Sequence, residues 1–233
     1  MLPTVWDVWT ARMLEQAGFQ ALTIGSHPVA DSIGGADGEQ MAFDHYMAIT
    51  RSIVEAVHIP VSIDVESGYG LEPADLMRRV IDTGAAGLDV EDTVHRDGGR
   101  VRSLQEHADF IGRLRDAADE ARLPIVINGR TDALKHGAKI FDDPIGEATA
   151  RASAMEEAGA RAVYPVGIQI VEELQQLVVA VSVPVNVTVD PVTASPLGGF
   201  SELKAIGARR FTFGPKWQAA ATTALNEQLT GWL

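Results

Sequence analysis

The chain has 233 residues, of which 46% are hydrophobic and 22% are charged. This composition is typical of a globular protein and excludes a largely disordered chain, which needs low hydrophobicity and high charge. Acidic residues outnumber basic ones by 32 to 19, for a formal net charge of −13. This balance argues against a nucleic-acid partner, since such proteins present a basic surface. The absence of cysteine excludes disulfides, thiolate metal sites and cysteine nucleophiles.

We expect a cytoplasmic protein that neither crosses nor binds a membrane. The first residues, MLPTVWDVWT, lack the basic segment and long apolar run of a signal peptide. No apolar run approaches the roughly 18 residues that a membrane-spanning helix needs.

Two patterns alternate along the chain, and each ends in a short apolar segment that predicts a β-strand. In one pattern a proline opens the strand, where proline is tolerated, at residues 2–6, 59–64, 123–129 and 183–188. In the other, a glycine stops a helix and the strand follows, at residues 17–24, 83–92, 158–165 and 206–214.

Helices are predicted between these strands, at residues 8–17, 42–57, 73–83, 104–121, 143–158, 169–180, 200–206 and 215–230. In 104–121, for example, Leu104, Ile111 and Leu114 lie on one apolar face. Apolar strands that alternate with helices indicate a parallel sheet covered on both faces. We therefore predict an α/β fold, a single-domain (β/α)8 TIM-type barrel over residues 1–233. A doubly wound open sheet is the alternative, although the chain has no GxGxxG after its first strand and no Walker A motif.

In a (β/α)8 barrel the active site lies at the carboxyl ends of the strands, and polar residues of this chain cluster there. Asp64 and Glu66 follow one predicted strand, and Glu91 ends the next. Clustered carboxylates repel one another unless a hard cation joins them, so these three predict a Mg²⁺ site, with Mn²⁺ as the alternative ion. The other reading is that some of these acids cap the helices that follow.

Further polar residues at strand ends are candidates for substrate binding. Arg130 follows a buried strand and must meet an anion, which is either a substrate carboxylate or a neighbouring acid. Asn128 and Asn186 could bind substrate oxygens or satisfy buried backbone groups. His27 follows the second strand and is a candidate pocket residue. No HxH or HExxH spacing predicts zinc.

The polar segment 93–103 is predicted to be a gating loop that closes over the substrate and excludes water. It contains two adjacent glycines and the basic residues Arg96, Arg100 and Arg102. The alternative is a plain surface loop.

Four segments resemble the isocitrate lyase/phosphoenolpyruvate mutase superfamily, and within it the short phosphonomutase-like (carboxyvinyl-carboxyphosphonate phosphorylmutase-like) members. They are VWDVWTARMLEQAGFQAL (5–22), DVESGYG (64–70), LDVED (88–92) and INGRTDA (127–133). The resemblance extends from about residue 3 to residue 225. It implies a (β/α)8 barrel, dependence on Mg²⁺, a small 2-oxo acid or its enolate as substrate, and a homo-oligomer.

The resemblance also implies roles for single residues. Asp64 would be the direct metal ligand, and Glu66 and Glu91 would hold the metal largely through its waters. Ser26 and His27 stand where backbone amides bind the substrate carboxylate. The resemblance further implies that Asp37 lies at the edge of the site and helps to hold the metal shell, that Arg130 binds the substrate, and that the 93–103 loop is the gate. We also predict Asp37 as a substrate-binding residue. Our predicted catalytic residues are Glu91, Arg130, Arg96 and Arg100, the last two acting on the leaving group.

The chain departs from the superfamily at catalytic positions. Isocitrate and methylisocitrate lyases carry a KKCGH-type loop, and this chain has no cysteine. The lysine and histidine of phosphonomutases are replaced by Thr93 and, approximately, Val166. We therefore predict a Mg²⁺-dependent carbon–carbon lyase or oxaloacetate-type decarboxylase, since a cation and an arginine stabilise an enolate-like species. Alternatives are phosphonopyruvate mutase or hydrolase activity, and a catalytically degenerate barrel that binds a metabolite.

Overall fold

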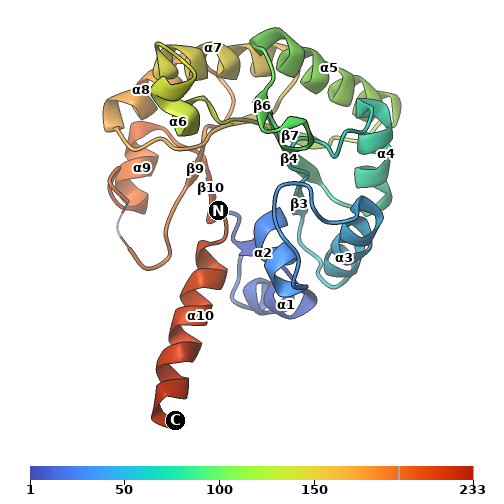
Figure 1. Ribbon diagram of the computed structural model, residues 1–233, viewed down its shortest axis with the longest axis vertical. Helices are drawn as coiled ribbons and strands as arrows, with labels where there is room; N and C mark the ends of the chain where they lie inside the picture. The colour runs from blue at the N-terminus through green and yellow to red at the C-terminus, as the bar shows by residue number, and fades with distance from the viewer. Residues whose placement is uncertain (194, 233) are drawn as a thin grey trace.

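A parallel β-sheet surrounded by helices forms the body of the protein in the computed structural model, which describes residues 1–193 and 195–232 (Figure 1). The sheet order is β1-β2-β3-β4-β7-β8, and β9 and β10 form a separate parallel pair. The strands are β1 (Thr4–Val5), β2 (Leu22–Ile24), β3 (Val61–Asp64), β4 (Gly87–Glu91), β7 (Val126–Thr131), β8 (Ala162–Pro165), β9 (Asn186–Thr188) and β10 (Arg210–Thr212). Each overlaps one of the predicted strand segments, so the α/β class with a parallel sheet is confirmed.

Backbone contacts extend beyond the two sheets. The N–H of Val163 in β8 donates to the carbonyl of Pro184, just before β9, over 3.1 Å. At the other edge, the N–H of Leu2 donates to the carbonyl of Phe211 in β10 over 2.8 Å.

The predicted helices form close to their expected bounds. They are α1 (Val8–Gln16), α3 (Phe43–Glu55), α4 (Pro73–Asp82), α5 (Leu104–Glu120), α7 (Pro144–Glu157), α8 (Val171–Ala180), α9 (Phe200–Ile206) and α10 (Lys216–Leu229). The structure adds α2 (Ser26–Ser32), which the sequence did not predict. It also adds α6 (Ala133–His136) and the 3₁₀ turns η1 (His95–Asp97), η2 (Gly137–Lys139) and η3 (Thr230–Trp232), which are too short to show a helical period in the sequence. Among the helices described, none is both long and apolar enough to cross a membrane.

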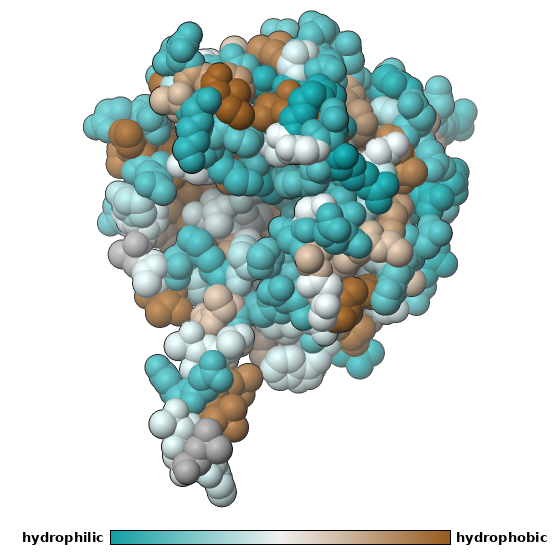
Figure 2. Space-filling view, viewed as in Figure 1, coloured by the Kyte–Doolittle hydropathy of each residue, from teal (hydrophilic) through white to brown (hydrophobic). Residues whose placement is uncertain are grey.

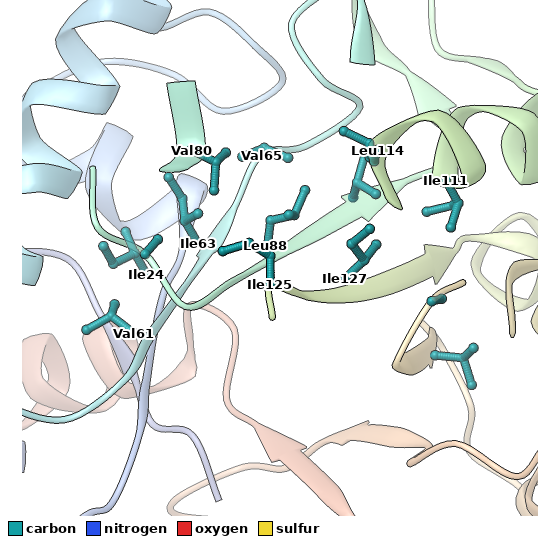
Figure 3. Packing of buried hydrophobic residues seen from close by; sticks show 14 of the residues in the cluster. Ile24, Val61, Ile63, Val65, Val80, Leu88, Ile111, Leu114, Ile125 and Ile127 are labelled. Atoms are coloured by element: carbon teal, nitrogen blue, oxygen red, sulfur yellow. The ribbon is translucent and has the colours of Figure 1, made fainter. Parts of the chain in front are cut away.

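Apolar and polar side chains alternate along the central strands, so one face of the sheet is apolar and the other is polar. Ile63, Leu88 and Ile127 are fully buried and belong to the hydrophobic cluster that also contains residues of α4 and α5 (Figure 3). Successive strand residues point to opposite faces, so Asp64, Asp89 and Asn128, which are register neighbours, point away from that cluster. The sheet therefore places polar side chains at its centre.

The predicted gating loop is a small antiparallel hairpin, a difference from the expected irregular loop. Its strands are β5 (Thr93–Val94) and β6 (Arg100–Val101), which are too short to be predicted. Gly98 and Gly99 form the turn with φ of 63° and 78°, a region that glycine enters readily. The hairpin ends at the capping box of α5, in which Ser103 Oγ accepts from the Glu106 N–H over 3.2 Å.

Candidate functional site

A cavity of about 450 Å³ lies at the carboxyl ends of the strands. Its wall contains five residues that the sequence predicted for the site: Ser26, His27, Asp37, Asp64 and Arg130. The carboxyl ends of the strands therefore bring together residues that lie more than 100 positions apart in the chain. Other lining residues include Thr4, Thr23, Asp89, Tyr164, Thr188, Asp190, Thr212 and Lys216.

Asp64 is a partly exposed acid at the end of β3 that faces this cavity. Its Oδ1 accepts from the Glu66 N–H over 2.9 Å, and its Oδ2 lies 3.2 Å from Ser26 Oγ. Burial raises the pKa of Asp64 to about 8, and the nearby acids Glu91, Asp89 and Glu66 add to this, although Arg130 opposes it. Among the residues described, no lysine, arginine or histidine forms an ion pair with Asp64. The site thus holds a partly exposed carboxylate that forms no direct ion pair with a described residue.

Glu66 points away from the cavity. Its Oε1 accepts from Tyr69 OH and its Oε2 from the Glu39 N–H, both over 2.6 Å. Burial raises its pKa to about 7 in spite of these two hydrogen bonds. Glu66 and Tyr69 have φ of 50° and 55°, an uncommon conformation for residues with a side chain. The backbone of this turn is strained so that the carboxylate is held behind Asp64.

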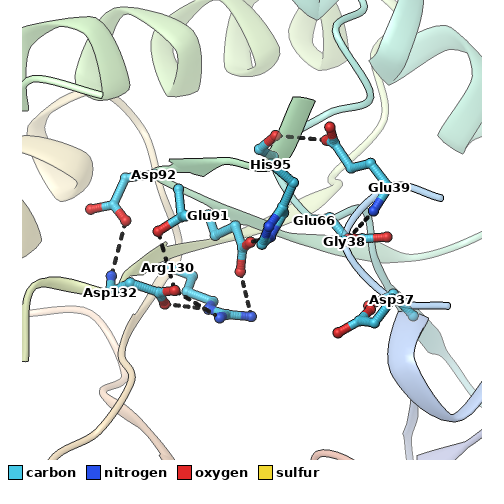
Figure 4. A network of polar contacts seen from close by, with 12 residues as sticks. Asp37, Gly38, Glu39, Glu66, Glu91, Asp92, His95, Arg130 and Asp132 are labelled. Atoms are coloured by element: carbon cyan, nitrogen blue, oxygen red, sulfur yellow. Dashed lines mark hydrogen bonds and ion pairs between the residues drawn. The ribbon is translucent and has the colours of Figure 1, made fainter. Parts of the chain in front are cut away.

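Glu91 and Arg130 form the centre of a polar network between β4 and β7 (Figure 4). Arg130 Nη1 lies 2.5 Å from Glu91 Oε2, and Arg130 Nε lies 2.8 Å from Asp132 Oδ1. Burial would lower the pKa of Arg130, but Glu91 and Asp132 outweigh it and raise it. Glu91 also contacts His95 Nε2 and raises the pKa of that histidine. Arg130 therefore pairs with neighbouring acids, which is one of the two readings from the sequence. It also lines the cavity, and its contact with a substrate carboxylate stays a prediction.

The acids fit a cation that keeps most of its waters. Within residues 1–193 and 195–232, no three His, Asp or Glu side chains are placed to bind one ion together. Asp64 and Asp37 reach the cavity, while Glu66 and Glu91 lie behind its wall. Mg²⁺ suits such a donor set, because it binds through one or two carboxylates and retains water. The helix-cap reading fails for Asp64 and Glu66, because the cap of the helix that follows them, α4, is Glu72.

Ser26 and His27 belong to the first turn of α2, beside Asp37. His27 Nδ1 and Asp37 Oδ2 are 3.2 Å apart, and Ser26 Oγ is 3.2 Å from Asp37 Oδ1. Both side chains of the His27–Asp37 pair are nearly half exposed, so this part of the site is the open rim of the cavity.

The hairpin 93–103 lies over the acids and is held there. Arg102 donates to the carbonyls of Glu91 and Ser67 over 3.0 and 2.8 Å. Arg96 Nε lies 3.6 Å from Glu39 Oε2. Arg100 instead pairs with Asp97 and Glu106, away from the cavity. The structure thus brings Arg96 to the acids and leaves Arg100 outside; their catalytic roles stay predictions.

Neither Asn128 nor Asn186 lines the cavity. Both are fully buried. Asn186 Nδ2 donates to Thr212 Oγ1 over 3.0 Å, while the Asn128 amide has no hydrogen-bond partner in the described part of the chain. Neither amide binds a backbone group there, so a contact with substrate stays a prediction.

Sequence reasoning missed three residues at the site. Asp89 lies two positions before Glu91 on the same strand, and the two-residue period of β4 could have placed it on the same face. Tyr164 is the penultimate residue of β8 and lines the cavity. The guanidinium of Arg130 lies 5.9 Å from the centre of its ring. Glu39 accepts from Ser67 Oγ and the Tyr69 N–H, and only the tertiary fold reveals that.

Comparison with known proteins places the chain in a family. The family model for phosphoenolpyruvate phosphomutase matches residues 1–233. The 2-methylisocitrate lyase of Escherichia coli (strain K12) is 32% identical over 205 residues, which are 83% of this chain and 66% of that protein. The chain therefore covers slightly less than two thirds of this relative's length. The oxaloacetate decarboxylase of Rhodopseudomonas palustris (strain ATCC BAA-98 / CGA009) is 28% identical, over 97% of this chain and 78% of that protein.

Comparison of the fold with solved structures indicates the same family. A crystal structure from Burkholderia cenocepacia J2315, provisionally named a phosphonomutase, is 34% identical with a TM-score of 0.89. The match covers 98% of this chain and 92% of that one. From the matched family model, the shared fold and the strand-end acids together, the chain belongs to the phosphoenolpyruvate phosphomutase family, within the isocitrate lyase/phosphoenolpyruvate mutase superfamily.

Proposed function

We propose that this protein is a Mg²⁺-dependent lyase that cleaves a carbon–carbon bond of a small 2-oxo acid or hydroxy acid, or decarboxylates an oxaloacetate-like compound. One observation carries the proposal: Asp64 and Arg130 open onto the same cavity. Asp64 is a partly exposed carboxylate with a raised pKa and no ion-pair partner among the residues described. Arg130 offers a guanidinium to an anion. A carboxylate substrate and a cation would satisfy both.

The residues at the cavity have complementary tasks. Bound Mg²⁺ would supply positive charge that favours an enolate-like species next to a ketone. Arg130 would bind the substrate carboxylate, because a guanidinium pairs with a carboxylate through two hydrogen bonds. Asp132 and Glu91 fix its orientation from behind. The Ser26 hydroxyl would orient Asp64 or the substrate, and the 93–103 hairpin would exclude water.

The relatives carry names of two reactions, 2-methylisocitrate cleavage and oxaloacetate decarboxylation. This chain lacks the cysteine of the lyase loop. A lyase reaction here must therefore obtain its proton transfer from another group, and His95, which contacts Glu91, is the nearest titratable side chain of the hairpin to the acids.

The test measures release of pyruvate or glyoxylate through lactate dehydrogenase and NADH. The substrates are oxaloacetate, 2-methylisocitrate, 2,3-dimethylmalate and phosphonopyruvate, each with Mg²⁺ and with EDTA. Arg130→Lys keeps the charge but loses the fork to Asp132, and Arg113→Lys is the matched control, because Arg113 is exposed and pairs with Glu72.

We expect Mg²⁺-dependent turnover of a carbon substrate that falls at least 10-fold in Arg130→Lys and not in Arg113→Lys. Turnover of phosphonopyruvate alone would support phosphonate chemistry in its place. Binding of pyruvate without turnover of any substrate would support the degenerate barrel.

The closed (β/α)8 barrel and the homo-oligomer belong to the same proposal. The backbone hydrogen bonds from Leu2 to Phe211 and from Val163 to Pro184 support closure.

Support for self-association comes from α10, which extends from the body and presents apolar side chains (Figure 2). Leu225 and Leu229 are 60% and 56% exposed, and Trp232 is 88% exposed. Light scattering coupled to size exclusion, on the full chain and on Leu225→Ser/Leu229→Ser, tests this part.

A further inference from the structure

Arg151 is a buried arginine that the proposed reaction does not use. It belongs to α7, and only 4% of its side chain is exposed. It does not line the cavity. A guanidinium stays charged and carries five N–H donors, so in the interior it needs acceptors around it. The groups that accept from Arg151 therefore show what it holds in place.

The completely buried carboxylate of Asp92 is the first of these acceptors. Arg151 Nη1 lies 3.1 Å from Asp92 Oδ2 and also donates to the carbonyl of Arg102 over 2.8 Å. The N–H of Arg102 donates back to the carbonyl of Asp92 over 2.8 Å. On its other side, Arg151 Nε lies 2.8 Å from Glu147 Oε1, one helical turn away. Arg151 thus joins Asp92 to the end of the 93–103 hairpin.

Asp92 connects this contact to Arg130 (Figure 4). Its Oδ1 accepts from the N–H of Asp132 over 2.9 Å, and its Oδ2 accepts from Thr131 Oγ1 over 2.6 Å. Asp132 in turn accepts from Arg130 Nε and Nη2 over 2.8 and 3.1 Å. Three contacts in series therefore link Arg151 to the guanidinium in the cavity wall.

The pairing of Arg130 fixes the direction in which its remaining donors point. Its contacts with Asp132 and Glu91 engage the Nε–H and one N–H of each terminal nitrogen. Two of the five N–H donors are left without an acceptor in the described part of the chain. A guanidinium binds a carboxylate through two hydrogen bonds only where the two planes match. The acids that orient Arg130 are therefore as important to a substrate carboxylate as its charge.

We infer that Arg151, acting through Asp92, is a positioning residue that sets the orientation of the Arg130 guanidinium and anchors the end of the 93–103 hairpin. The part that concerns Arg130 rests on the proposed function, which supplies the substrate carboxylate. The part that concerns the hairpin does not depend on that function.

Arg151→Met tests the inference, because methionine fills similar space and donates no hydrogen bond. Arg115→Met is the matched control. Arg115 is a buried arginine of α5, and its Nη1 donates to the carbonyl of Ile125 over 2.8 Å, at the amino end of β7 and away from the cavity. Calorimetry on the full chain measures the affinity for pyruvate with Mg²⁺ and, separately, the affinity for Mn²⁺ alone.

Hydrogen exchange of two amides, followed by NMR, is the second measurement. The N–H groups of Arg102 and Asp132 both donate to Asp92, the former to its carbonyl and the latter to its carboxylate. Their exchange reports whether Asp92 still holds the hairpin and the Arg130 side of the site.

In Arg151→Met we expect pyruvate to bind at least 10-fold more weakly, because the fork of Arg130 is no longer held in one plane. The affinity for Mn²⁺ should change less than about 3-fold, since Asp64 is not part of this series of contacts. The two amides should exchange at least 10-fold faster than in Arg115→Met, which should bind pyruvate as the native protein does.

Asp92→Asn/Arg151→Met replaces the single variant if Arg151→Met does not fold, because the single variant leaves Asp92 as an unpaired buried charge. The double variant removes both charges and still lacks the donor to the Arg102 carbonyl. It should show the same loss of pyruvate affinity and the same faster amide exchange.

Each outcome bears on one of the two proposals. Native pyruvate affinity in the Arg151 variant overturns the role toward Arg130, and so does an equal loss in Arg115→Met or a parallel fall in Mn²⁺ affinity. Unchanged amide exchange overturns the role at the hairpin. If the native protein does not bind pyruvate with Mg²⁺, the proposed function fails and the role toward Arg130 fails with it, while amide exchange still decides the role at the hairpin.

Discussion

Arg130 and Glu91 occupy register-paired positions on β7 and β4, and their charged groups meet 2.5 Å apart. The Glu91 side chain is 2% exposed and that of Arg130 17%. The Glu91 carboxylate therefore lies behind the cavity wall, whereas the Arg130 guanidinium reaches the cavity.

Glu91→Gln should lower the free energy of unfolding by about 2 kcal/mol, because a buried charge loses its partner while Asp132 still holds Arg130. Urea unfolding followed by circular dichroism measures this. The exposed Glu72→Gln, which breaks the surface pair with Arg113, should change stability by less than about 0.5 kcal/mol. Equal effects of the two substitutions would contradict a structural role for the Arg130–Glu91 pair.

Asp64→Asn should weaken Mn²⁺ or Mg²⁺ binding by about 10- to 100-fold, since it removes the carboxylate that faces the cavity. Calorimetry with Mn²⁺, without substrate, measures the affinity independently of activity. Asp82→Asn on the surface of α4 is the matched control, because the half-exposed Asp82 carboxylate pairs with Arg78, outside the cavity. Unchanged metal affinity in Asp64→Asn would mean that the cation is bound elsewhere.

His107 predicts how stability depends on pH. It is 1% exposed, and its Nε2 lies 3.1 Å from the carbonyl oxygen of Arg130. Burial lowers its pKa to about 3, with Arg102 and Arg151 adding to the effect and Asp132 opposing it. Between this value and the ordinary pKa of 6.5, the unfolded chain binds a proton that the folded chain refuses.

The contribution of His107 to stability should therefore be complete above about pH 6.5 and fall as the pH decreases toward 3, by at most about 1.4 kcal/mol per pH unit. His107→Gln should make the profile shallower, because glutamine does not titrate. His58→Gln is the matched control, since 95% of the His58 side chain is exposed. Parallel profiles for the native protein and His107→Gln would contradict the prediction.

Arg102 should keep the 93–103 hairpin closed. Besides its hydrogen bonds to Glu91 and Ser67, its guanidinium stacks 4.1 Å from the Phe110 ring centre. Arg102→Lys should increase amide hydrogen exchange at residues 93–101 by about 10-fold, because lysine cannot donate to both carbonyls in a fixed plane. Arg100→Lys, which changes only contacts with Asp97 and Glu106, should leave exchange within the hairpin's antiparallel pair much closer to native.

The sequence predicted helices and strands well where the element is long enough to repeat its periodic pattern of apolar residues. Helices such as 104–121 and the apolar strands follow from spacing alone, because burial of one face imposes a repeat on the residues. The short α6 and the 93–103 hairpin escaped prediction, since a few residues do not establish a period, and α2 escaped it as well. Strand-end position also predicted Asp64 and Arg130 as cavity residues, since a barrel or sheet gathers the carboxyl ends of parallel strands at one side.

By itself, the sequence determined the α/β class, the order of strands and helices, and which acids and which arginine stand at strand ends. Only the tertiary structure decided which of those side chains reach the cavity: Asp64 and Arg130 do, whereas Glu66 turns back to Tyr69 and Arg100 stays at the surface. It alone brought Arg210 to Asp89, 121 residues away. The physical reason is that period and composition constrain neighbours along the chain, while the partner of a buried charge is set by desolvation and by how the strands meet across the interior.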